Sequence, residues 1–204
     1  MTSRFLNLVF TPSVKAAQQQ NGSRDAYAKR DSASEPDRLT ENEAQFIATR
    51  DSFYMASVGA AGWPYIQHRG GPPGFIKVLG ERTLGLADFR GNRQYVSVGN
   101  LADDNRVALF MMDYARRARL KLLGRARTVD LADAPDLAAT LIDQGYNAKV
   151  ERGLIIELEA FDWNCPQHIT PRFALAEFEP SVATLKARIA ELEAAMARNG
   201  SSTQ

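Results

Sequence analysis

Arg69 is the one charged side chain in a loop that is otherwise built of glycine and proline. The surrounding segment, residues 63–75, reads WPYIQHRGGPPGF, so an apolar strand runs into this loop. Glycine lets another molecule approach the backbone closely, and proline limits the entropy that is lost when a loop becomes ordered. The pattern indicates a platform for a flat or anionic ligand. A plain turn between two strands is the alternative.

A second candidate, residues 91–95, reads GNRQY and lies between an expected strand and an expected helix. Asn92 can cap that helix, and Arg93 adds a positive charge beside the amide groups of the first turn. Free amides and a cation at the start of a helix are the usual means of holding a phosphate. Ordinary helix capping explains the same residues without a ligand.

A row of basic residues marks the strand that is expected at residues 118–129. Leu120 and Leu122 take the opposite parity, so one face of this strand is apolar and the other is cationic. Phosphate groups or an electron-rich ring would suit the cations, whereas nucleic acid is less favoured because no stacking aromatics alternate with them. A solvated surface is the alternative. The cations are Arg117, Arg119, Lys121, Arg125 and Arg127.

Residues 162–173 read DWNCPQHITPRF and combine polar and aromatic side chains after the last expected strand. Such a segment indicates binding, although Trp163 could instead anchor the core with its indole N–H bonded to the backbone. Cys165 lies three residues before His168, but Pro166 and the lack of a recognisable oxyanion loop argue against a thiol protease. The spacing of the cysteine and the histidines fits no structural zinc site, so no metal is expected.

Seven short β-rich runs, separated by brief turns, are expected to position these residues. Connections this short join antiparallel neighbours. Helices are expected at 93–102 and 133–144, and a capping box of Thr40 with Glu43 starts another before the first strand. This order predicts a small antiparallel barrel with helical insertions, a mainly-β or α+β fold. The runs are residues 53–58, 63–68, 75–79, 83–87, 107–113, 118–129 and 154–161.

Composition divides the chain into three regions. Residues 1–38 are predicted to form an N-terminal extension with little core, residues 39–180 the barrel domain, and residues 181–204 a C-terminal helix and tail. Apolar residues at steps of three and four predict an amphipathic helix over residues 181–198. Packing of this helix on the chain's own barrel is favoured over pairing with another subunit. The apolar residues are Val182, Leu185, Ile189, Leu192 and Met196.

The composition of the 204 residues, with 45% hydrophobic content and a net charge of +1, is typical of a soluble globular domain. So small a net charge argues against recruitment by nucleic acid or anionic lipid. The single cysteine fits a reducing compartment, and no stretch has the pattern of a signal peptide or the length of a membrane span. We therefore expect a cytoplasmic protein. No P-loop, dinucleotide fingerprint or serine elbow is present.

Taken together, four segments resemble the pyridoxamine 5'-phosphate oxidase-related family of FMN-binding split barrels. Two of them are quoted above, and the others are GNRQYVSVGNL at residues 91–101 and RLKLLGRAR at residues 119–127. The resemblance covers about residues 10–173 and is strongest to the bacterial branch that is labelled only as FMN-binding. It implies an antiparallel split β-barrel and a homodimer with two FMN molecules in the subunit interface.

The resemblance also implies which residues contact FMN. Those that would lie along the flavin are Gln67, His68, Arg69, Gly70, Gly71 and Pro72. Asn92, Arg93 and Gln94 would hold the phosphate, and Arg119 and Lys121 would approach the ring or the phosphate from the basic strand. Trp163 and Arg172 would come from the other subunit, with Gln167 of the same segment as a further cofactor contact.

The chain departs from the oxidase itself at two places that concern the substrate. Gly70, Gly71 and Pro72 stand where the flavin strand of the oxidase continues toward a lysine. Residues 169–171, Ile-Thr-Pro, stand where the oxidase has an Arg-Leu-His signature. Oxidation of vitamin B6 is therefore not expected.

The resemblance favours an FMN-dependent oxidoreductase whose substrate or electron donor the sequence does not name. A cation such as Arg69 or Arg119 near the ring would stabilise the anionic reduced flavin. A non-catalytic protein that stores, senses or shuttles FMN is the alternative, because no substrate-reading motif lies beside the flavin strand. A member that uses F420 or heme is a third possibility.

Overall fold

The computed structural model describes residues 3–28, 35–163 and 166–200. Contacts divide the chain into a larger unit, residues 1–113 with 118–166, and a smaller unit, residues 114–117 with 167–204. The larger unit contains the sheet, and the smaller unit contains the C-terminal helix.

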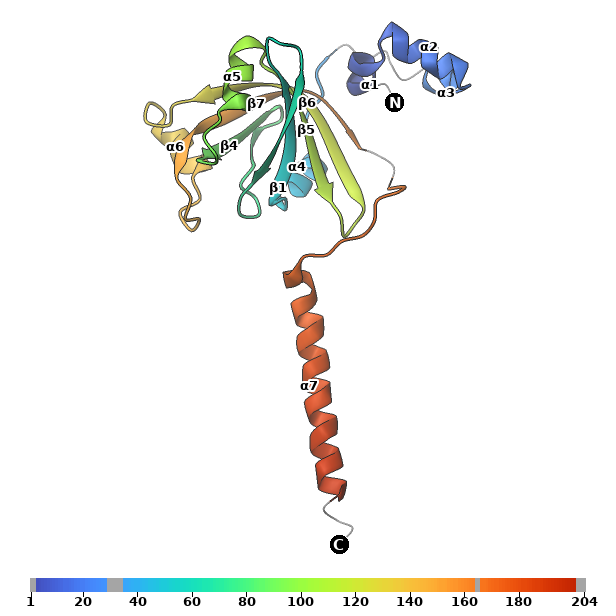
Figure 1. Cartoon of the computed structure of the whole chain (residues 1–204), viewed down its shortest axis with the longest axis vertical. Helices are drawn as coiled ribbons and strands as arrows, with labels where there is room; N and C mark the ends of the chain where they lie inside the picture. Colours follow the sequence, from blue (N-terminus) through green and yellow to red (C-terminus); the bar gives the residue numbers. More distant parts are fainter. Residues whose placement is uncertain (1–2, 29–34, 164–165, 201–204) are drawn as a thin grey trace. The chain divides into compact units, whose positions relative to one another are not determined.

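The larger unit is built around one antiparallel sheet of seven strands, and all seven predicted strands are confirmed (Figure 1). The strands follow the order β2-β1-β5-β6-β7-β4-β3, so β2 and β3 form the two edges. Together with the peripheral helices this is the predicted α+β fold, an antiparallel split barrel whose sheet is not closed by pairing of its edges. The bounds are β1 Ser52–Val58, β2 Pro64–Gly70, β3 Lys77–Gly80, β4 Thr83–Phe89, β5 Arg106–Asp113, β6 Ala118–Val129 and β7 Val150–Trp163.

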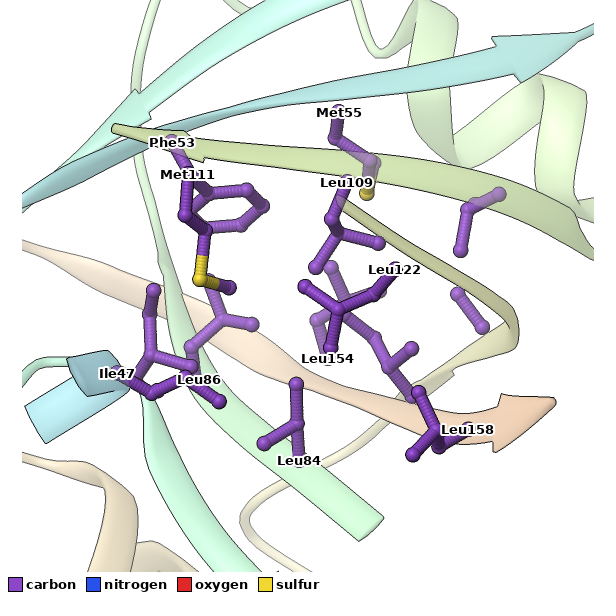
Figure 2. Close-up of a cluster of buried hydrophobic side chains, with 14 of the residues drawn as sticks. Ile47, Phe53, Met55, Leu84, Leu86, Leu109, Met111, Leu122, Leu154 and Leu158 are labelled. Carbon is purple, nitrogen blue, oxygen red and sulfur yellow. The ribbon is translucent and has the colours of Figure 1, made fainter. Parts of the chain in front are cut away.

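One face of the sheet carries the hydrophobic core. Alternate residues of β1 and β5 are buried, among them Met55 and Leu109, because successive side chains of a strand point to opposite faces. Figure 2 shows these side chains directed toward one another and toward Leu122 and Leu154. The fully buried Ile47 adds a helix to the same cluster. The opposite parity of the strands therefore faces away from the core.

Short helices accompany the sheet. The capping box predicted before the first strand is present, since a Glu43 carboxylate oxygen accepts the Thr40 N–H at 3.0 Å. Neither α2 nor α3 buries a side chain, whereas α1 buries Phe5. The bounds are α1 Arg4–Val9, α2 Pro12–Gln20, α3 Arg24–Tyr27, α4 Glu41–Ala48, α5 Val96–Asp103 and α6 Pro135–Leu141.

Three predicted helices have different bounds. Helix α5 begins at Val96 and not at residue 93, because Arg93 and Tyr95 have φ angles of 63° and 53°, which a right-handed helix cannot contain. Helix α6 runs from Pro135 to Leu141 and is therefore shorter at both ends than the predicted range of 133–144. The C-terminal helix, α7, runs over Leu175–Gly200 and so begins before residue 181.

The smaller unit consists mainly of α7, which Figure 1 shows as one continuous helix. A Glu177 carboxylate oxygen accepts the Ala174 N–H at 2.6 Å, which explains the early start of this helix. The apolar side chains of the predicted stripe are exposed within the smaller unit. Their packing on the barrel stays a prediction. No helix in the described part of the chain has the length and apolar content to cross a membrane.

Candidate functional site

A cavity of about 300 Å³ lies in the larger unit between β2, the end of β4 and the start of α5. Two segments that the sequence nominated separately, the Gly/Pro platform and the phosphate turn, meet in it. Pockets for small molecules span about 300–1,000 Å³, so the cavity suits part or all of a cofactor-sized ligand. The predicted residues that line it are Gln67, His68, Arg69, Gly70, Asn92, Arg93 and Gln94.

Edge strand β2 directs alternate side chains toward the cavity. Tyr65 and Gln67 share one parity with Arg69, and the Tyr65 hydroxyl donates a hydrogen bond to the Gln67 side-chain oxygen. His68 has the other parity and also borders the cavity, with its ring edge-on to Tyr54 at 5.5 Å between centroids. Strand β2 therefore supplies the cavity with polar groups whose positions are fixed.

A network of ion pairs lines the floor of the cavity. The Arg69 guanidinium pairs with Asp88, and these two side chains are only 12% and 14% exposed. Arg152 joins the network, with its Nε 3.5 Å from the second oxygen of Asp88 and a terminal nitrogen 3.1 Å from Glu151. Arg90 Nε lies 2.7 Å from the other oxygen of Glu151. Arg69 is thus held in place and partly neutralised, while its buried Nε–H has no hydrogen-bond partner among the described residues.

Glu151 is kept ionised by its neighbours. A hydrogen bond from Arg90 lowers the pKa of the Glu151 carboxyl, and bonds from Arg152 and Tyr95 reinforce this effect against desolvation. The Tyr95 hydroxyl lies 3.2 Å from the carboxylate. A carboxylate with its pKa lowered by such donors is a poor general acid or base at neutral pH.

The phosphate turn differs from the prediction in one respect. Asn92 does not cap the helix: its side-chain oxygen accepts the Gln94 N–H at 3.1 Å, and the capping position belongs to Tyr95. The first backbone bond of α5 runs from Gly99 N–H to the Tyr95 carbonyl, so the amides of the first turn of α5 have no helical acceptor, and the residues of that turn border the cavity. Arg93 is exposed, and within the described part of the chain its side chain has no partner. Free amides and an unpaired cation therefore meet at one end of the cavity.

Gly71 and Pro72 do not line the cavity in this chain. A Cβ on Gly71 would lie 2.6 Å from the Phe75 ring, so a structural reason for glycine exists at this position without a ligand. Gly74 has a φ of 80° and donates its N–H to the Arg50 carbonyl at 3.0 Å. The loop is thus also a well-packed turn, which was the alternative interpretation of this segment.

The basic strand lies away from the cavity. Arg119 and Lys121 have the parity of β6 that faces away from the core. The Arg119 guanidinium lies over the Phe110 ring at 5.2 Å, and Lys121 pairs with Asp162 at 2.6 Å and lies over the Phe5 ring at 4.7 Å. Lys121 borders a second, apolar cavity of about 540 Å³ on this outer face. Neither cation lines the cavity that contains the phosphate turn.

Trp163 is half-buried and anchors the core. Its indole N–H donates to a Glu43 carboxylate oxygen at 2.7 Å, and its ring is edge-on to Phe46 at 4.8 Å. The core-anchor interpretation named a backbone partner for the indole, and this detail was wrong: the acceptor is a side chain 120 residues away in the sequence. A long-range contact of this kind leaves no local signal in a sequence.

The remaining predicted residues lie in the smaller unit. The Arg172 guanidinium lies over the Tyr114 ring at 5.1 Å, and Gln167 is exposed. Cys165 lies outside the described residues. The roles predicted for Gln167 and Arg172 depend on a second chain.

Sequence comparison identifies the family. A family model described as pyridoxamine 5'-phosphate oxidase matches residues 39–164, which is more than half of the chain. The chain belongs to the pyridoxamine 5'-phosphate oxidase family. No curated protein gives a significant sequence match.

Solved structures related to this oxidase-family chain share little of its sequence. HupZ of Group A Streptococcus matches with 15% identity over 66% of this chain and 99% of its own, with a TM-score of 0.48. A pyridoxinephosphate oxidase-family protein related to general stress protein 26, from Clostridium acetobutylicum, gives 18% over 67% and 94% with a TM-score of 0.44. An FMN-binding protein of Syntrophomonas wolfei gives 14% over 75% and 95% with a TM-score of 0.43.

Sequence reasoning missed the acidic half of the site in this family member. Asp88 pairs with Arg69 and Arg152, and Glu151 pairs with Arg90 and Arg152, yet the sequence nominated only Arg69 of these five residues. Asp88 and Arg152 are register partners on β4 and β7, so strand pairing brings them together from positions that are far apart in the sequence. The only local signal was a carboxylate within an apolar strand, immediately before the phosphate turn.

The cavity is suited to binding rather than to proton transfer. It offers free amides, an unpaired cation and fixed arginines, which together favour an anionic ligand. Its two carboxylates, Asp88 and Glu151, are both ion-paired. Among the described residues of the cavity, neither carboxylate is thus free to act as an acid or base, and His68 is a titratable ring that also borders it.

Proposed function

We propose that this oxidase-family protein binds FMN, with the phosphate at the turn of residues 92–94 and the flavin along β2. One observation carries the proposal: the flavin strand and the phosphate turn, nominated separately in the sequence, border the same cavity. The family match is independent support for a flavin, because it does not depend on the cavity.

The residues present fit a phosphate ester. Arg93 supplies a charge without a partner in the described chain, and the first turn of α5 supplies amide donors. The buried Nε–H of Arg69 is a further unused donor beside β2. FMN, when bound, supplies hydride and one-electron chemistry, while the protein supplies binding, orientation and electrostatics. Because Asp88 pairs with Arg69, Arg69 stabilises an anionic flavin less than an unpaired arginine would.

We also propose that FMN lies in the interface of a homodimer. The outer face of the sheet supports this, because Ile66 and Tyr54 are exposed there beside the apolar cavity of about 540 Å³. Exposed apolar patches of this kind mark interaction surfaces. In such a dimer the second chain brings Arg119 and Lys121 to the flavin, together with Gln167 and Arg172.

The favoured activity is that of an FMN-dependent oxidoreductase with a small substrate or electron donor. The missing substrate signature at residues 169–171 argues against vitamin B6 oxidation. The fully paired carboxylates of the cavity favour a second candidate, a non-catalytic protein that stores, senses or shuttles FMN. Reactions that need only hydride transfer remain compatible with such a cavity.

The first experiment is the visible absorption spectrum of the purified protein, with mass identification of whatever is released on denaturation. Flavin absorption and released FMN are expected. A Soret band, or a deazaflavin such as F420, would overturn the FMN assignment.

Stopped-flow mixing with NADH or NADPH under air separates the two candidate functions. Bleaching of the bound flavin faster than that of free FMN is expected for the oxidoreductase. Bleaching no faster than that of free FMN, with either donor, would favour the binding protein.

A further inference from the structure

Helix α7 carries an unbroken heptad repeat of apolar residues that the rest of the smaller unit leaves exposed. Its 26 residues span about 39 Å at 1.5 Å per residue. Apolar residues recur at alternating steps of three and four along it, and each is at least 42% exposed. The sequence a-d-a-d-a-d-a is filled by Leu175, Phe178, Val182, Leu185, Ile189, Leu192 and Met196.

We propose that α7 pairs with α7 of a second copy of this chain as a parallel, in-register, two-stranded coiled coil. A helix whose apolar stripe is exposed along its whole length must find a partner, because most helical stability in water comes from packing that stripe. The repeat lies outside the oxidase-family match at residues 39–164, so it is an addition to the family domain.

The kinds of apolar residue favour two strands in parallel. Val182 and Ile189 are β-branched residues at a positions, and Leu185 and Leu192 occupy the d positions between and after them. β-branched residues at a with leucine at d favour parallel dimers over higher oligomers. The centre of the repeat, which contributes most to pairing, thus has the composition of a two-stranded coil.

The charges that flank the stripe distinguish the two possible orientations. In a parallel pair, the g position of one helix faces the following e position of the other, which places Arg188 opposite Glu193. In an antiparallel pair g faces g and e faces e, which places Arg188 opposite Arg188 and Lys186 opposite Lys186. The parallel arrangement therefore joins opposite charges, and the antiparallel arrangement opposes like charges.

Other features of α7 do not obstruct the pairing. Pro180 falls at an f position, on the side of the helix away from the stripe, and its carbonyl accepts the Thr184 hydroxyl at 3.0 Å. Arg188 also pairs with Glu191 of its own helix at 2.8 Å, and both side chains are about two-thirds exposed. An exposed pair of this kind is weak and can be shared with Glu193 of a second copy.

Cysteine cross-linking of the full chain tests both the pairing and its orientation. In a Cys165→Ser background, which removes the only native thiol, Leu192→Cys places one thiol at a d position. A parallel pair brings the two introduced thiols within disulfide reach. Oxidation of the Leu192→Cys chain is therefore expected to give the covalent dimer about tenfold faster than oxidation of an Ala187→Cys chain, whose thiol lies at an f position. An antiparallel pair would instead cross-link a mixture of Val182→Cys and Leu192→Cys chains. Equal rates at positions 187 and 192, or the mixed product alone, would overturn the proposal.

The flanking charges provide a second measurement that leaves the stripe intact. Arg188→Glu and Glu193→Arg, each carried in the Leu192→Cys background, are expected to slow cross-linking because each places like charges opposite one another. A mixture of the two variants is expected to recover the original rate as a heterodimer. Unchanged cross-linking rates in both single variants would show that Arg188 and Glu193 do not face one another in the dimer. Flavin binding is a separate readout, so the cross-linking result stands whether or not the protein binds FMN.

Discussion

At the residue scale, the site depends on which charges have partners. Arg69, the most conspicuous residue of the sequence, is ion-paired with Asp88, whereas Arg93 in the phosphate turn has no partner in the described chain. An unpaired cation gives its full charge to a ligand, but a paired one must share it. Arg93 is therefore the residue whose loss should weaken phosphate binding most directly.

Arg93→Ala is expected to weaken FMN binding by about 1.5–3 kcal/mol, or roughly 10- to 150-fold in Kd, by removing a charge-assisted contact. Fluorescence titration of apoprotein with FMN would measure this change. Arg82→Ala is the matched control, because Arg82 is an exposed arginine that does not line the cavity. If both variants bound FMN with equal affinity, the phosphate of FMN would not be bound at this turn.

Glu43 links the folding of the domain to pH. Burial alone would raise the pKa of this carboxyl, but hydrogen bonds from Thr40, Trp163 and Asn42 outweigh it and lower the pKa to about 2. A pKa lowered by folding contributes stability above the unfolded value, which is about 4.3. The free energy of unfolding should therefore fall as pH drops from about 4.3 toward 2.

Glu43→Gln is expected to lower the free energy of unfolding at pH 7 by about 1–3 kcal/mol, because buried donors lose their charged acceptor. The difference from the unmodified protein should shrink as the pH approaches 2. Denaturant titrations between pH 2 and 7 would measure it. Glu41→Gln, in the exposed first turn of the same helix, should change stability little at any pH. A pH-independent loss in the Glu43 variant would show that charge is not the cause.

At the element scale, the loop between β2 and β3 joins the candidate site to the core. Phe75, at its end, is buried, lines the cavity and stacks on Phe53 at 5.9 Å between ring centroids. Gly71 permits this arrangement, because a Cβ would overlap the Phe75 ring. The glycines that suggested a ligand platform thus also shape the wall of the cavity.

Gly71→Ala is expected to lower the free energy of unfolding by about 1–3 kcal/mol, because the Phe75 ring must move to avoid overpacking. The midpoint of chemical denaturation would record this loss. Gly80→Ala is the control, since a Cβ there meets no atom within 4 Å. If the two substitutions had the same effect, the contact with Phe75 would not be what requires glycine.

At the scale of the whole molecule, the described chain exposes two apolar surfaces. One is the outer face of the sheet around Ile66, which is 66% exposed, and the other is the stripe on α7. Exposed apolar surface on this scale is characteristic of chains that associate. The homodimer proposal therefore has one candidate contact in each of the two units.

Ile66→Arg is expected to raise the dimer dissociation constant roughly tenfold or more, as the loss of an interface hot spot does. The reason is that the dimer would bury an unpaired charge against the apolar cavity. Analytical ultracentrifugation over a range of concentrations would measure the change, and FMN retention should fall with it. Val14→Arg, on the partly exposed apolar surface of α2, is the control. A variant that stays dimeric would exclude the outer face of the sheet as the interface.

By itself, the sequence determined the strands, the family and the two segments that form the cavity. These follow from local patterns: alternation of apolar residues, turn residues at short intervals, and a glycine-rich segment beside a cation. The capping box of Thr40 and Glu43 was readable for the same reason, because both partners lie within one helical turn.

Only the tertiary structure decided how the charges are shared. The fold brings Asp88 within ion-pairing distance of Arg69, and the pairing of β4 with β7 adds Arg152 to the same carboxylate. The indole N–H of Trp163 likewise finds its acceptor in Glu43, which lies 120 residues away in the sequence. Positive φ angles at Arg93 and Tyr95 moved the helix start to Val96, so the first-turn amides of α5 border the cavity. Contacts between residues far apart in the chain depend on strand register and packing, which no local pattern encodes.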